Sequence, residues 1–353
     1  MKEVLRSRRV ENGSSKLAPI CLMSRLGDAR HNGACCALLC SVRFVFDEAS
    51  WEAVPNVFET LLNLGAMQLS LVENIGLPSG PEIIAFCATI FVTDAFCHEA
   101  RTILPPYLGS QIVRRCVAGN LPVSAYGQRS GGANVMMCYS GGPCDSLSSD
   151  HLLAVREKMA EAFRLAHSGY QLKEFLAEPI GQEASRWMLN TGFHLRRDYS
   201  DYYQAQNRPL PLFSKRSCLV GLTKEEALAE YGSRASGLFS YSPPRFHFTH
   251  GEQAVLHRSL VGETDKETAV NLRISPWTVK KRWHAIYERV ADIDSALLPS
   301  VHHELETVSR GTERRRHLLA YLREHLEELR PLNGAPPPIA GEGLRAMIRR
   351  KAR

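Results

Sequence analysis

Short apolar runs alternate with stretches of helical period from Val42 to about Tyr203. That alternation is typical of a mixed α/β domain, in which amphipathic helices separate buried strands. The run from Ile83 to Thr93, IIAFCATIFVT, predicts a buried strand. Residues 150–167 predict a helix, because their apolar positions share one stripe and Gly169 follows as a stop.

Proline and glycine mark a boundary further along the chain. Residues 205–247 are rich in both around a short helical stretch at 225–231, so we expect an interdomain linker there. The expected order is a poorly ordered arm (1–40), an α/β sensor domain (41–204), the linker (205–247), a helical domain (248–292), a helical extension (293–330) and a flexible basic tail (331–353). The predicted fold class is an α/β N-terminal domain plus an all-α C-terminal helix-turn-helix domain with an added C-terminal helix.

Capping residues predict three helix starts between Phe248 and Val290. Thr249 and Thr264 are each followed three positions later by glutamate, which is the capping-box pattern. Ser275 stands before Pro276, and proline suits the first helical position because its missing N–H would have no partner there. The spacing of these starts permits three short helices joined by tight turns.

The third of these helices has two distinct faces. Its apolar positions recur at spacings of four, three and four, which places Val279, Trp283, Ile286 and Val290 on one stripe. The opposite face carries Trp277, Lys281, His284 and Glu288, with Lys280 and Arg282 on the flanks. A helix with donors on its outer face suits the major groove of DNA. A three-helix bundle with a solvated lysine face gives the same pattern, so this alternative stays open at this point.

The stretch FTHGEQAVLHRSLVGETDKETAVNLRISPWTVKKRWHAIYERV resembles the LuxR-type helix-turn-helix over residues 248–290 without a gap. The ISP-x-TVKK segment is its most specific part. The resemblance implies that Lys280, Lys281 and His284 contact bases or phosphates, that Thr278 and Lys266 contact the DNA backbone, and that Arg282 and Trp277 belong to the same interface. Three departures from the family pattern are Arg273 in place of glycine, Trp277 in place of arginine, and Thr268 in place of isoleucine or valine.

This resemblance implies a sequence-specific DNA-binding transcription regulator that is not an enzyme. Its expected partners are double-stranded DNA and a second copy in a homodimer, with RNA polymerase as a further candidate. The N-terminal domain would receive an unidentified small-molecule effector; no catalytic residue, cofactor or metal is expected. The chain lacks a Gly-Lys-Ser/Thr phosphate loop, which argues against the ATPase-linked members of the family.

A second resemblance supports an alternative function. Residues 183–203, EASRWMLNTGFHLRRDYSDYY, resemble the C-terminal end of GNAT acyltransferases. By this resemblance the acyl-CoA loop would fall at residues 105–116, PPYLGSQIVRRC. Only Gly109 and Ser110 are small enough there to let backbone N–H groups cradle a pyrophosphate. The alternative is therefore a GNAT-like acyltransferase carrying a DNA-binding appendage.

Charge and cysteine content add less. The segment from Arg245 onward holds 19 Lys and Arg against 14 Asp and Glu, which is five of the net charge of +6. Cys35, Cys36 and Cys40 with His31 could form a metal or redox site, but ACCALLC also fits an apolar segment in which cysteine is a small hydrophobe. We expect no membrane span, no export signal and a cytoplasmic protein. A leucine stripe at Leu319, Leu322, Leu326 and Leu329 would dock on its own domain or pair with a second subunit.

Overall fold

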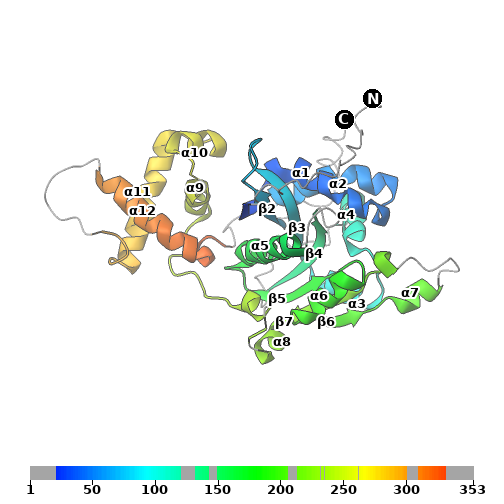
Figure 1. Cartoon of the computed structure of the whole chain (residues 1–353). Coiled ribbons are helices and arrows are strands. Elements are labelled where there is room, and N and C mark those ends of the chain that lie inside the picture. The colour runs from blue at the N-terminus through cyan, green and yellow to red at the C-terminus, as the bar shows by residue number, and fades with distance from the viewer. Residues whose placement is uncertain are drawn as a thin grey trace.

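A seven-stranded mixed sheet organises most of the chain before residue 240 (Figure 1). The computed structural model describes residues 21–120, 132–142, 149–205, 213–230, 232–233, 235–260, 262–299 and 309–330. The strands are β1 (Leu22–Gly27), β2 (Met67–Asn74), β3 (Glu82–Val92), β4 (Ala133–Gly141), β5 (Leu172–Ala177), β6 (His194–Arg197) and β7 (Leu219–Thr223). Their order is β1-β2-β3-β4-β5-β7-β6, and every neighbouring pair is antiparallel except β4 and β5. The mixed α/β class is therefore confirmed.

Helices cover both faces of this sheet. One face carries α1 (Asn32–Leu38), α2 (Glu48–Asn63), α3 (Asp94–Thr102), α4 (Leu108–Ala118) and α7 (Ser200–Ala205). The other face carries α5 (Ser149–His167), α6 (Gln182–Asn190) and α8 (Lys224–Ala229). The short 3-10 helices are η1 (Ala29–His31), η2 (Leu39–Val45), η3 (Phe213–Lys215) and η4 (Ser236–Phe239). We call the body formed by the described residues between 21 and 239 the sheet part.

The two clearest sequence predictions in the sheet part are confirmed. β3 is buried on both faces, with Phe86 in the core under α1 to α4 and Phe91 in the core under α5. A central strand enclosed in this way reads as a continuous apolar run, which is how the segment stands out in the sequence. The helix expected at 150–167 is α5, and Gly169 follows it with a φ of +83°.

Two expected boundaries differ from the structure. The arm expected to be poorly ordered, 1–40, contains β1, η1 and α1 within residues 22–38, while residues 1–20 lie outside the described part. Residues 205–247 are not only a linker, because they contain β7, which pairs with both β5 and β6 inside the sheet. The apolar run of β7 is only five residues long, and the prolines and glycines around it hide it from a composition argument. The expected helical stretch in this segment is present as α8.

The described residues between 245 and 330 form a second body, which we call the helical part. It comprises α9 (His250–Leu260), α10 (Asp265–Leu272), α11 (Pro276–Ile293), α12 (Ser309–Glu324) and η5 (Leu326–Leu329). The three predicted caps are present: Thr249 and Thr264 each pair with the glutamate three residues later, and Ser275 accepts from the N–H of Thr278. Val279, Ile286 and Val290 of the predicted stripe are fully buried in its core.

The leucine stripe of α12 and η5 is used inside this body. Leu319, Leu322 and Leu329 are buried against α9 and α11 residues of the same core. Docking on its own body is therefore what the structure shows for these leucines, and pairing with a second subunit stays a prediction. The basic tail, 331–353, lies outside the described residues. In the described part no helix is long and apolar enough to cross a membrane.

Candidate active site

The parallel pair β4 and β5 sets the position of the candidate site. Among the described strands it is the one parallel pair, and α5 connects the end of β4 to the start of β5. Their carboxyl ends therefore lie at the same edge of the sheet. In open α/β sheets this edge is where ligands bind, because the strand ends and the following helix N-terminus converge there.

The two strands separate at this edge. Their pairing ends at Met137 and Ala177, although β4 continues to Gly141 against β3. The chain beyond β5 turns toward the β7 side instead, where Ile180 forms a bridge with Ser217. Pro179 has no N–H to offer a neighbouring strand, which favours this separation. The first residue past the paired region of β5 is Glu178.

Glu178 places a carboxylate at the opening between the strands. Its Oε1 accepts from the Tyr107 N–H at 2.5 Å and from the Ser217 hydroxyl at 2.6 Å, and its Oε2 accepts from the Leu108 N–H. Burial raises the pKa of Glu178 to about 7, and these hydrogen bonds oppose that rise only in part. The carboxyl group therefore exchanges its proton near neutral pH.

Tyr139 of β4 lies next to this carboxylate. Burial raises the pKa of its phenol, and the charge of Glu178 adds to the rise. Its ring stacks on Phe46 with centroids 5.4 Å apart and also contacts Phe58. Gly109 makes room for the ring, because a Cβ at that position would lie 2.5 Å from the Tyr139 Cζ. The Tyr139 hydroxyl is buried and has no hydrogen-bond partner within the described residues.

Three further tyrosines surround the same carboxylate. Tyr107 takes a left-handed backbone conformation, φ 69°, which aims its N–H at Glu178. Tyr199 is fully buried, and its hydroxyl lacks a partner in the described part of the chain. Burial raises its pKa, and the charge of Glu178 adds to the rise. Tyr203 accepts from the Ser217 N–H at 3.2 Å. The edge thus combines one titrating carboxyl with the phenols of Tyr107, Tyr139 and Tyr199, whose pKa values burial raises.

The segment 105–116 does not act as the expected acyl-CoA loop. It covers the turn before α4 and most of that helix, which lies between β3 and β4 in the chain rather than between β4 and β5. The N–H groups of Tyr107 and Leu108 at this helix start are already bound by Glu178, so an anionic pyrophosphate would meet a carboxylate there. The connection that follows β4 begins at Gly141 and Gly142, and residues 143–148 lie outside the described part.

The residues predicted to contact DNA lie on a different surface. Trp277, Lys280, Lys281 and His284 are exposed on α11. In Figure 1 this helix lies on the side of the helical part away from the sheet, with α9 between them. Trp277 is 69% exposed, and the Lys281 Nζ lies 5.5 Å from its ring centroid.

The other three predicted contact residues differ in their exposure and contacts. Lys266 is exposed on α10. The Thr278 hydroxyl lies 2.9 Å from the Ser275 hydroxyl, so it takes part in the cap of α11. Arg282 is partly buried, and a Cβ on Gly251 would lie 3.0 Å from its guanidinium carbon, so this arginine lies against the start of α9.

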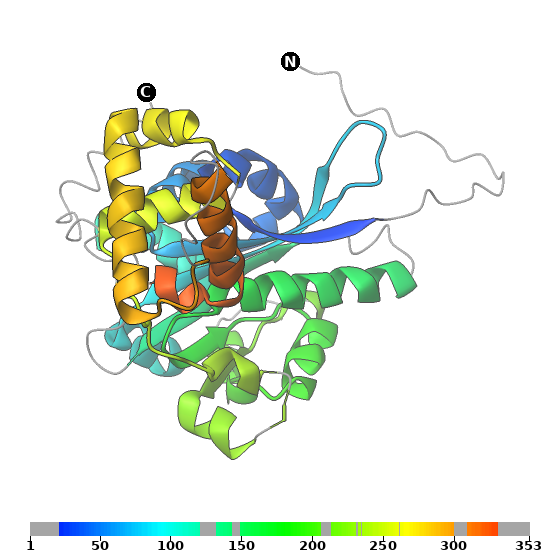
Figure 2. The same cartoon turned by 90° about the vertical axis from the view of Figure 1, so that its left-hand side faces the viewer.

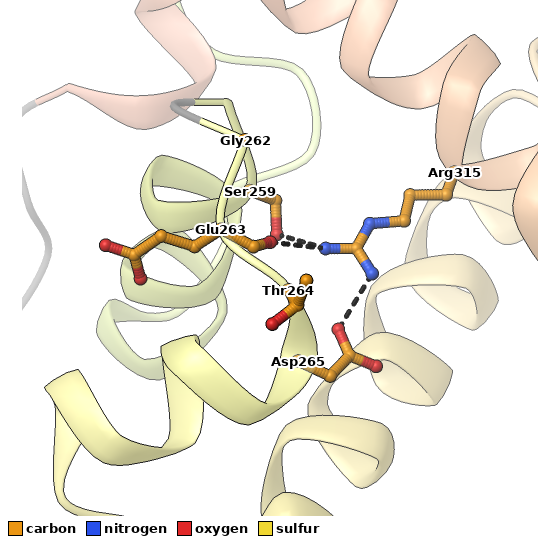
Figure 3. Close-up of a pocket in the computed structure, with 6 residues that line it drawn as sticks. All are labelled: Ser259, Gly262, Glu263, Thr264, Asp265 and Arg315. Carbon is orange, nitrogen blue, oxygen red and sulfur yellow. Dashed lines mark hydrogen bonds and ion pairs between the residues drawn. The ribbon is translucent and has the colours of Figure 1, made fainter.

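A hollow in the helical part lies between α9, α10 and α12 (Figure 3). Arg315 occupies it, with hydrogen bonds to the Asp265 carboxylate at 2.7 Å and the Ser259 hydroxyl at 2.9 Å. Its guanidinium also lies 4.6 Å from the Trp283 ring centroid. Since these contacts already use the charge and the donors of Arg315, the hollow is a joint between helices.

The cysteine cluster near the start of the chain has no site chemistry in the described residues. Burial raises the pKa of Cys35 to about 12 and that of Cys36 to about 11, so both remain thiols at neutral pH. The His31 Nδ1 lies 3.0 Å from the Asp28 carboxylate. No group of three or more His, Cys, Asp or Glu side chains is arranged to hold a metal ion in the part of the chain that is described.

No family model matches the chain, and no curated protein matches it. Among solved structures, the chain is similar to one described as a bacterial toxin, with 10% identity over 60% of this chain and 95% of that chain and a TM-score of 0.31. It is also similar to the AHL synthase LasI, with 12% identity over 61% of this chain and 97% of that chain and a TM-score of 0.31. Likenesses of this size carry no information about substrate.

The comparison contradicts two sequence predictions. These are that the function of the chain is that of a sequence-specific DNA-binding transcription regulator, and that the chain is not an enzyme. The neighbours are a toxin and a synthase, which is an enzyme, and neither is described as a regulator.

Sequence reasoning missed the residues at the strand edge. Glu178 stands directly after an apolar strand and before Pro179, a pattern that could have drawn attention to it. The pattern gains meaning only when β5 is known to be parallel to β4. Tyr139 and Tyr199 had no pattern of their own, because neither belongs to a recognised motif.

Proposed function

We propose that the sheet part is an acyltransferase that works at the carboxyl ends of β4 and β5, and that the helical part is a DNA-binding appendage. The observation that carries the enzymatic proposal is the opened strand pair with Glu178 and Tyr139 at its edge. The GNAT resemblance of residues 183–203 supports the same class, since α6, the turn at Gly192 and β6 follow one another there.

The donor that suits this site is an acyl thioester and the acceptor is an amine. The amine nitrogen attacks the thioester carbonyl carbon and loses a proton to the Glu178 carboxylate. The carbon–sulfur bond then breaks, and the leaving thiolate takes the proton from the Glu178 carboxyl group. An amide and a free thiol are formed, and Glu178 is ionised again. No oxidant, reductant or metal enters this balance.

The acidity of Glu178 matches this role. A general base works best when its pKa lies near the working pH, because it is then both ionised and basic enough to accept a proton. Burial places the pKa of Glu178 at about 7, whereas an ordinary glutamate would be a weak base. The end of β5 sets the position of Glu178, and burial sets its basicity.

The enzymatic proposal is tested by thiol release. The purified chain is mixed with acetyl-CoA or longer acyl-CoA thioesters and a panel of amines, and the free thiol is followed by its reaction with a chromogenic disulfide. We expect amine-dependent release that Glu178→Gln lowers about 100-fold or more, as loss of a general base does. Glu183→Gln is the matched control, because Glu183 is an exposed partner of Arg156 on the surface. Absence of release with every donor, together with no acetyl-CoA binding by calorimetry, would refute the proposal.

DNA binding by the helical part is proposed on a separate observation. The exposed face of α11 brings Trp277, Lys280, Lys281 and His284 together at a well-capped helix start. The LuxR-type resemblance of residues 248–290 supports duplex DNA as the partner of this face. Lysine contacts to phosphate release counterions, so binding must weaken as salt rises.

Fluorescence anisotropy of a labelled duplex tests this part. We expect Lys280→Ala and Lys281→Ala each to weaken binding and to reduce the slope of log affinity against log salt by about 1 if the lysine contacts a phosphate. Arg323→Ala, an exposed change on α12, is the control and should leave the slope unchanged. If binding is absent, or is insensitive to salt and to both lysines, the appendage does not bind DNA through this face.

A further inference from the structure

One buried arginine closes the joint between the two parts of the chain. Arg330 follows η5 directly, is 5% exposed, and donates from Nη1 to the carbonyl oxygens of Leu165, Ala166 and Ser168 at 2.8, 3.0 and 2.7 Å. These carbonyls belong to the end of α5, where the helix dipole favours a cation. The guanidinium also lies 5.4 Å from the Tyr170 ring centroid. Figure 2 shows the orange end of the helical part, α12 and η5, beside the end of the green helix α5.

The backbone around Arg330 fits α5 closely. A Cβ on Gly169 would lie 2.5 Å from the Glu327 nitrogen, so glycine is required for this approach as well as for its positive φ. On its other side η5 is held by the helical part, because the Glu328 carboxylate accepts from the N–H groups of Arg245 and Phe246, both at 2.9 Å. The segment Leu326–Arg330 therefore lies between α9 and the end of α5.

The two parts are joined covalently by a short irregular segment, residues 240–244. Residues 240–244 form no helix or strand and are exposed or only partly buried. Pro243 and Pro244 keep this segment extended. Fixed structure resumes at Arg245 and Phe246, where Glu328 binds the backbone. A short exposed connection of this sort is where hinges form.

We propose that residues 240–244 are a hinge and that Arg330 is a reversible latch, so that the helical part has a latched and a released arrangement on the sheet part. No carboxylate of the described residues is bonded to the Arg330 guanidinium, whose partners are carbonyl oxygens and a ring. Burial without a counter-charge lowers the pKa of Arg330. The latched state is therefore costly, because the charged guanidinium loses its water there. Water can replace all of these contacts on release. The inference goes beyond the proposed function and does not depend on it.

Hydrogen exchange and small-angle X-ray scattering of the full chain test the latch. We expect Arg330→Ala to raise the radius of gyration and to speed amide exchange at residues 165–170 by about tenfold or more, because the last turn of α5 loses its cap. Arg323→Ala removes an exposed arginine of α12 and should change neither measurement.

A second variant keeps the test valid if Arg330→Ala fails to fold. Gly169→Asn retains a residue that tolerates a positive φ, but its Cβ enters the space of the Glu327 backbone. It should release the helical part without removing the charge. If both variants fold and keep the wild-type radius of gyration and the wild-type exchange at the end of α5, the proposed latch is wrong.

Discussion

At the scale of a single residue, Glu178 makes the free energy of unfolding depend on pH. Its pKa rises from 4.5 to about 7 on folding, so between these values the native state holds a proton that the unfolded chain releases. The free energy of unfolding should therefore fall as pH rises from about 4.5 to 7 and level off above. The limit is about 1.4 kcal/mol per pH unit for one proton, and we expect a fraction of it because the residue is only partly buried. Guanidinium titrations of wild type and Glu178→Gln measure the difference in slope, and parallel curves would contradict this account.

Arg273 has a strained backbone conformation that glycine would adopt without strain. It closes α10 with a φ of 53°, the left-handed conformation that favours glycine. Its side chain is exposed, so little packing is lost on removal. We expect Arg273→Gly to stabilise the chain by about 1 kcal/mol in chemical denaturation. A destabilised variant would show that the arginine has a stabilising contact after all.

Single residues differ in how far the sequence predicts them. The buried stripe of α11 follows from helical period alone, because Val279, Ile286 and Val290 must share one face. The left-handed conformation of Arg273 agrees with the LuxR-type resemblance, which has glycine at this position. Glu178 and Tyr139 could not be paired in this way, since they meet only through the parallel register of β4 and β5.

At the scale of elements, the contact between α4 and β4 depends on one glycine. Gly109 in the first turn of α4 faces the Tyr139 ring with no space for a Cβ. We expect Gly109→Ala to cost about 1 to 3 kcal/mol through overpacking. The double variant with Tyr139→Leu should recover part of this loss, and the coupling energy from a denaturation cycle measures it. Additive costs would show that the two elements are not packed through this pair.

Elements were predicted best where the pattern is long or capped. α5 and β3 have long apolar periods, and α9 to α11 carry their caps in the sequence. β1 and β7 were missed because each is short and lies beside polar or proline-rich sequence. β7 also joins the sheet between β5 and β6, an insertion that local sequence does not encode.

At the scale of the whole molecule, the sheet part and the helical part have separate cores. Leu322 is fully buried in the helical core and has no place in the cores of the sheet. We expect Leu322→Ala to destabilise the helical part by about 2 to 5 kcal/mol. Amide exchange should then speed up in α9, α11 and α12 but stay unchanged in β3 and β4. Equal acceleration in both bodies would show one cooperative unit instead of two.

The most direct test of the enzymatic proposal is the pH dependence of thiol release from acetyl-CoA in the presence of an amine acceptor. If Glu178 takes the proton, the rate should rise about tenfold per pH unit below its pKa and level off above a break near pH 7. Glu178→Gln should lack this break at whatever residual rate remains, while Glu183→Gln should keep it. A wild-type profile without a break near pH 7, or one that Glu178→Gln preserves, would contradict the proposal that the strand edge at Glu178 is the site of acyl transfer.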